Sequence, residues 1–135
     1  MKILAYLATI SLFASHVMAQ EHSGKDDRWG ETSAEIRQWY RELMQPDNPT
    51  ISCCGEADAY WADLFEVAPD GSYIAIITEE ERKVVPQGRP NIPSGTKIPV
   101  PNRKLKFDRG NPTGHGIIFM SGAGDVYCYI VPGGV

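Results

Sequence analysis

Three cysteines are the residues of this chain whose types and spacing are best suited to chemistry. Cys53 and Cys54 are adjacent in the stretch TISCCGEADAYW, and Cys128 lies near the C-terminus. Adjacent cysteines rarely bond to each other, because the small ring that they close strains the peptide between them. We therefore expect a disulfide between Cys128 and either Cys53 or Cys54, with one thiol left over. Closing a loop of about 75 residues stabilises a fold by on the order of 4 kcal/mol.

The same residues also suggest a soft-metal centre. Thiolates and imidazoles are ligands for copper and zinc, and Cys53, Cys54, Cys128 and His115 together supply three thiolates and one imidazole. His115 lies in the sequence TGHG, just before a predicted strand that pairs with the strand carrying Cys128. Copper is the sharpest specific hypothesis and zinc the alternative. A purely structural role competes for each residue, since no C-x-x-C motif or zinc-finger spacing is present.

Thiol catalysis is a third possibility. Cys54, His115 and either Glu56 or Asp58 would supply a nucleophile, a base and an acid. In the competing interpretation, Glu56 and Asp58 cap a short helical turn over residues 57–62. No known nucleophile signature surrounds the cysteines, so the sequence leans against an enzyme.

The first residues, MKILAYLATISLFASHVMAQ, have the pattern of a cleaved secretory signal. Lys2 is followed by an apolar run over 3–14, and small residues at Val17 and Ala19 predict cleavage after Ala19. We expect a signal over 1–19, a flexible arm over 20–31 and one domain over 32–135, in a periplasmic or secreted protein. After cleavage, His22 would be the third residue, where its imidazole and the terminal amine form another candidate copper site.

Composition narrows the classes of partner. No second apolar stretch reaches the roughly 20 residues that a membrane-spanning helix needs. Cleavage removes Lys2 and no acid, which changes the net charge from −4 to −5. This balance predicts no nucleic-acid-binding face, and it leaves a metal ion or another periplasmic protein as the expected partner.

The predicted elements are one helix followed by short strands. TSAEIRQWYRELM (32–44) has helical periodicity and begins with a capping box of Thr32 and Glu35. Alternating or β-rich stretches predict the strands, and PDG and SGAGD mark hairpin turns. The predicted strands cover 61–68, 72–78, 96–100, 104–107, 117–120 and 126–131. The expected class is α+β and mostly β, with one N-terminal amphipathic helix packed on a small antiparallel sheet or partial barrel.

The stretches WYRELMQPDNPTISCCGEADAYWAD, IPVPNRKLKFDRGNPTGHGIIFM and VYCYIVPGGV resemble a group of small exported proteins of Gram-negative bacteria. The paired cysteines and the GNPTGHG loop are the specific parts of this resemblance. The resemblance implies secretion and a single domain, and it transfers no catalytic or binding residue.

These features predict a small periplasmic accessory or binding protein that handles a soft metal such as copper through its cysteines. The alternative is a disulfide-stabilised interaction module without metal, and a thiol-dependent enzyme is third. Apolar residues in WADLFEV and in the proline-rich stretch 86–101 are candidates for a docking surface.

Overall fold

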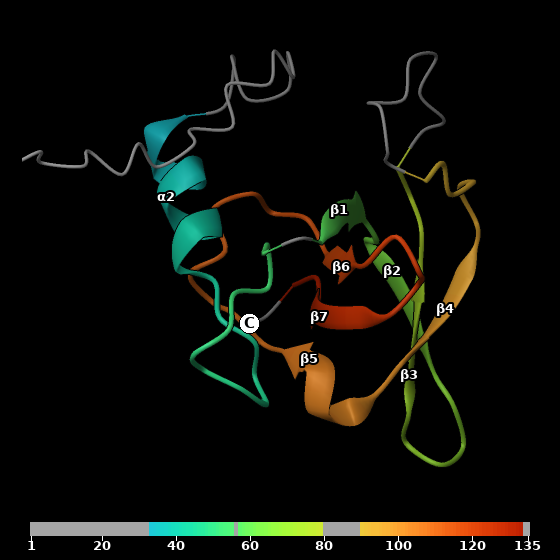
Figure 1. Cartoon of the computed structure of the whole chain (residues 1–135). Coiled ribbons are helices and arrows are strands. Elements are labelled where there is room, and N and C mark those ends of the chain that lie inside the picture. The colour runs from blue at the N-terminus through green and yellow to red at the C-terminus, as the bar shows by residue number, and fades with distance from the viewer. Residues whose placement is uncertain (1–32, 56, 80–89, 134–135) are drawn as a thin grey trace, which may run out of the picture.

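The fold has three layers, with a four-stranded sheet between a helix and a three-stranded sheet (Figure 1). The structure is a computed structural model, and it describes residues 33–55, 57–79 and 90–133. Its elements are α2 (Ala34–Glu42), β1 (Asp58–Trp61), β2 (Leu64–Val67), β3 (Tyr73–Ile76), β4 (Lys97–Val100), the 3-10 turn η1 (Asn102–Lys104), β5 (Leu105–Lys106), β6 (Ile117–Met120) and β7 (Val126–Ile130). The predicted class, α+β and mostly β, is confirmed.

The helix is shorter than its predicted span. Its N-cap is Ser33 rather than Thr32, and the Ser33 hydroxyl accepts a hydrogen bond from the backbone N–H of Ile36 at 3.2 Å. The helix ends at Glu42, because Leu43 adopts an extended backbone conformation. Leu43 is buried and Tyr40 packs beside it, so the helix is held through the C-terminal part of its apolar face.

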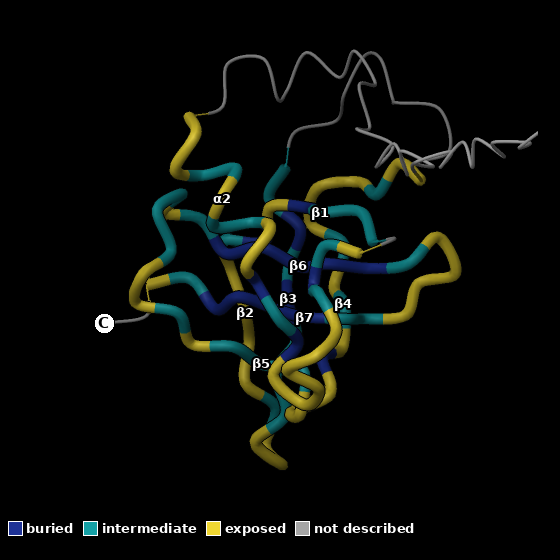
Figure 2. Tube along the Cα trace, turned by 60° about the vertical axis from the view of Figure 1, so that its left-hand side comes forward, coloured by how far each residue is buried: buried dark blue, intermediate teal, exposed yellow. Residues whose placement is uncertain are grey.

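The middle sheet has the strand order β1-β6-β7-β5. β6 and β7 form the predicted antiparallel hairpin, whereas β5 pairs with β7 in parallel. All four residues of β6 are buried, because both faces of this sheet are covered (Figure 2). Ile118 and Met120 belong to the core cluster shared with β3 and β4, while Ile117 and Phe119 belong to the cluster beneath the helix.

The second sheet has the order β2-β3-β4 and is antiparallel throughout. β2 and β3 are joined by the predicted PDG turn, in which Ala68 and Ser72 are hydrogen-bonded. The two sheets carry a core between them, and the helix packs on the other face of the four-stranded sheet.

Two expectations around residues 57–68 are wrong. Residues 57–62 do not form a helical turn, since β1 pairs with β6 along its whole length. The predicted strand 61–68 is interrupted at Ala62 and Asp63, where the chain leaves the middle sheet for the second one. Residues distant in the chain cause the interruption, because the Ala62 N–H donates to the Gly116 carbonyl and the Asp63 N–H donates to the Thr78 hydroxyl.

Several expectations lie outside the described residues. These are the signal over 1–19, the arm with His22, the candidate acid Glu56 and residues 86–89 of the proline-rich stretch. Within the described ranges, none of the helical structure has the length and apolar character that crossing a membrane requires.

Candidate functional site

The cysteines form a staple on the helix side of the middle sheet. Cys53 and Cys128 are joined in a disulfide, with their Cα atoms 5.6 Å apart. Both side chains are fully buried in the cluster that contains Leu43 and Phe119. The predicted disulfide to Cys128 is therefore present, and its partner is Cys53.

The structure does not bring the four predicted metal ligands together. The sulfurs of Cys53 and Cys128 are bonded to each other, so neither is a thiolate ligand. His115 instead makes its side-chain contacts with Asp63 and Trp61. Across residues 33–55, 57–79 and 90–133, no cluster of three or more histidine, cysteine, aspartate or glutamate side chains is arranged to hold a metal ion.

Cys54 is the remaining thiol, and its surroundings do not activate it. It is half-buried beside the helix-side cluster. Burial raises the pKa of the Cys54 thiol to about 12, because the charged thiolate loses its hydration. The nucleophilic form is thus scarce at neutral pH, which argues against thiol catalysis.

We expect Cys54 to react with iodoacetamide at neutral pH at least about tenfold more slowly than a free model thiol, because so little thiolate is present. The rate should keep rising with pH well above 9, since the pKa of this thiol is about 12. Mass spectrometry of the native, oxidised protein over time measures this rate. Alkylation as fast as that of the model thiol would show that Cys54 is activated.

A second cluster of polar side chains centres on His115. Its Nδ1 lies 3.0 Å and 3.2 Å from the two carboxylate oxygens of Asp63. Its ring stacks on Trp61 with a centroid distance of 4.0 Å and an interplanar angle of 8°. The loop holds its backbone, because Asn111 Nδ2 donates to the His115 carbonyl and the His115 N–H donates to the Thr113 hydroxyl.

Asp63 is saturated with donors. Besides His115, it accepts hydrogen bonds from the Gly116 N–H at 2.8 Å and from the Thr78 hydroxyl at 3.1 Å. A carboxylate bonded at Nδ1 orients an imidazole with Nε2 facing away from it, which suits both a general base and a ligand. Within the described residues, however, no group of three or more metal-ligating side chains forms around it. In the structure, this pair connects the loop before β6 to the segment at which the chain passes from the middle sheet to the second sheet.

Sequence reasoning selected His115 but missed Asp63. The expected acids for His115 were Glu56 and Asp58, whereas Asp63 is the carboxylate in contact. The partner of a carboxylate on a predicted strand cannot be read from the local sequence, because it depends on which loop lies beside the end of that strand. The glycines on either side of His115 were a signal in the sequence, because glycine is common where another backbone segment packs closely.

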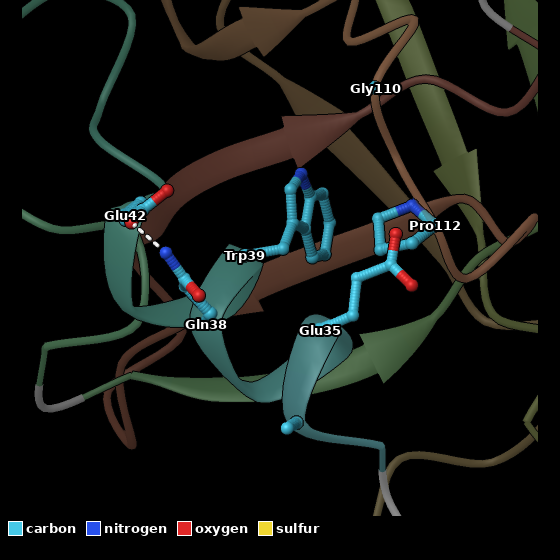
Figure 3. A pocket seen from close by; sticks show the side chains of 7 residues that line it. Glu35, Gln38, Trp39, Glu42, Gly110 and Pro112 are labelled. Carbon is cyan, nitrogen blue, oxygen red and sulfur yellow. Dashed lines mark hydrogen bonds between the residues drawn. The ribbon is translucent and has the colours of Figure 1, made fainter.

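A shallow hollow of about 480 Å³ lies between α2 and the loop before β6. Figure 3 shows the Trp39 ring standing in this hollow, with the Glu35 carboxylate pointing toward Pro112. Polar groups in the hollow already make hydrogen bonds within the protein. Trp39 Nε1 donates to Asp108 at 3.0 Å and Gln38 donates to Glu42 at 2.8 Å. The hollow is thus the seam at which the loop is anchored to the helix.

Comparisons of the chain with protein-family models, with curated proteins and with solved structures find no match. The fold and the site define a disulfide-stapled α+β domain.

Proposed function

We propose that this chain is a small exported module that docks another exported protein and does no chemistry with its cysteines. The N-terminal secretion pattern and the buried disulfide support export, because disulfides persist in oxidising compartments. Metal handling through the cysteines is the weaker alternative, since two of the three sulfurs are already bonded to each other.

One observation carries the docking role, an apolar row that we call the hairpin row. It consists of Phe65, Val67 and Tyr73 on the β2–β3 hairpin and of Phe107, which directly follows β5. The Phe65 and Tyr73 rings stack with centroids 5.2 Å apart, and Phe107 meets Tyr73 edge-on at 6.3 Å. Val67 lies directly opposite Tyr73 in the strand register. Exposed fractions are 54% for Val67 and 61% for Phe107, so large apolar side chains are left in solvent. A contiguous exposed apolar surface of this kind is typical of interaction sites.

The row overhangs the core between the sheets. The alternation of β3 places Tyr73 on the same side as Ala75, which is fully buried in that core. The register then places Phe65 and Val67 on this side too, but the middle sheet does not cover them. The apolar face of the hairpin that lines the core therefore continues past the edge of the middle sheet, where it is exposed to solvent.

The backbone of β2 offers a second means of contact. Within the described residues, β2 has β3 as a neighbour on one side and no strand on the other. The hydrogen-bonded pair at Ala68 and Ser72 sets the ladder alternation, so the backbone groups of Phe65 and Val67 point toward the free edge. An extended segment with alternating apolar residues fits such an edge, because it adds backbone hydrogen bonds and side-chain contacts together.

Site-specific photocrosslinking in the periplasm of an expressing cell tests this role. A photoreactive residue at Phe107 should give a discrete adduct with another protein, and the same residue at Asp125, an exposed position in the β6–β7 turn, should not. Val67→Glu should reduce the adduct, because it places a charge in the row. Equal adducts from both positions, or adducts that contain only this chain, would contradict docking of a different protein.

A further inference from the structure

A second hollow, of about 470 Å³, lies between the segment after α2, the turn η1 and strand β7. Its volume falls in the usual range of small-molecule sites. The lining residues are Gln45, Ile51, Ser52, Gly55, Lys104 and Tyr127. Ile51 is 48% exposed and contributes apolar wall, and Lys104 and Tyr127 line the same hollow.

A β-bulge sets the position of Tyr127. Phe119 is opposite Cys128 and Met120 is opposite Val126, so Tyr127 is an extra residue in β7 without a register partner. A bulge redirects the side chain of the extra residue, and bulges are frequent next to binding sites. The neighbouring disulfide at Cys128 holds this part of β7 in place. Among the described residues, the Tyr127 hydroxyl has no hydrogen-bond partner, so it is available to a ligand.

Lys104 is held in one orientation. Its side chain is only 13% exposed, and Nζ lies 2.8 Å from both Gln45 Oε1 and Asp47 Oδ1. Gln45 is itself buried and fixed, because its amide donates to the Ser52 carbonyl at 3.2 Å. An ammonium has three N–H donors, so Lys104 keeps one donor beyond these two bonds.

The charges around this hollow favour an anion, although the whole chain is acidic. Arg103 Nε lies 3.3 Å from Asp47 Oδ2, and Lys106 Nζ donates to the Met44 carbonyl at 3.0 Å. Arg103 and Lys104 thus share a single carboxylate, Asp47. The Lys104 hydrogen bond keeps the pKa of Asp47 below its usual value, so this carboxylate is charged and the local balance remains positive.

We propose that this hollow binds a small organic anion, a carboxylate attached to an aromatic or branched apolar body. The carboxylate accepts hydrogen bonds from Lys104 Nζ and from the Tyr127 hydroxyl, and the apolar body covers Ile51 and the Tyr127 ring. The proposal is independent of the docking role, because the hairpin row and this hollow share no residue.

An NMR titration of the oxidised protein with phenylacetate tests the proposal. We expect saturable shifts of the Ser52, Gly55 and Tyr127 amides. Lys104→Met should weaken binding about tenfold, as the loss of one charge-assisted hydrogen bond predicts, and Tyr127→Phe should weaken it several-fold. The matched control is Lys97→Met, because Lys97 is a surface lysine that pairs with Glu66 on the second sheet. That variant should bind like the wild type.

Three results would overturn the proposal: no saturable shift with phenylacetate, equally tight binding of the neutral analogue 2-phenylethanol, or unchanged affinity in both Lys104→Met and Tyr127→Phe. If Lys104→Met does not fold, Tyr127→Phe decides the question by itself. Removing the Tyr127 hydroxyl breaks no hydrogen bond within the described residues, so that variant should keep the fold.

Discussion

Cys128→Ala is expected to lower the free energy of unfolding by about 4 kcal/mol, the largest effect of any single substitution in the described domain. Cys53 and Cys128 are separated by 75 residues, so their bond removes much conformational freedom from the unfolded chain. It also joins β7 to the segment after the helix within one buried cluster. Guanidinium unfolding of the oxidised protein, followed by tryptophan fluorescence, measures the difference.

Four controls separate the disulfide from simple loss of packing. Cys53→Ala should match Cys128→Ala, and the double variant should be little worse than either one, because a single bond is lost in each case. Cys54→Ala should cost much less, since Cys54 is not bonded to another cysteine. Dithiothreitol should destabilise the wild type and leave Cys128→Ala unaffected. A large loss in Cys54→Ala with none in Cys53→Ala would show that the other pairing holds.

Gly116→Ala is expected to lower the free energy of unfolding by about 3 kcal/mol, through overpacking and strained hydrogen bonds. A Cβ atom at this position would overlap the Ala62 carbonyl oxygen and would lie 2.8 Å from Pro132 Cδ. One of these groups is backbone and the other a rigid ring, so neither yields easily. The Gly116 N–H bond to Asp63 and the Ala62 N–H bond to the Gly116 carbonyl, each 2.8 Å long, would be disturbed together.

Gly122→Ala is the matched control for this substitution. Gly122 lies in the β6–β7 turn, and a Cβ there would meet no atom within 4 Å. Urea unfolding should show Gly122→Ala close to the wild type. If Gly116→Ala were as stable as Gly122→Ala, the close approach of the two backbone segments at Ala62 would be wrong.

The sequence alone was enough to predict most of the regular elements. The helix and both hairpins were predictable because their signals are local: helical spacing of apolar residues, period-two alternation, and turn residues such as those of PDG. The existence of a disulfide to Cys128 was also predictable, since ring strain makes a bond between adjacent cysteines rare. These features depend on neighbours in the chain.

Only the tertiary structure decided between Cys53 and Cys54, because the two differ in which side chain points toward β7 and not in their sequence environment. The interruption of the strand at Ala62 and Asp63 likewise depends on a distant partner, the loop at Gly116. The pairing of Asp63 with His115 follows from that crossover.

The bulge at Tyr127 is likewise a feature that depends on residues distant in the chain. VYCYIV reads as a uniform strand, and the extra residue becomes visible only when β7 is set in register against β6. The sequence by itself therefore determined the helix, the two hairpins and the presence of a disulfide to Cys128. The tertiary structure decided which side chains meet, because contacts between residues far apart in the chain depend on register and crossover geometry, and these have no local signal.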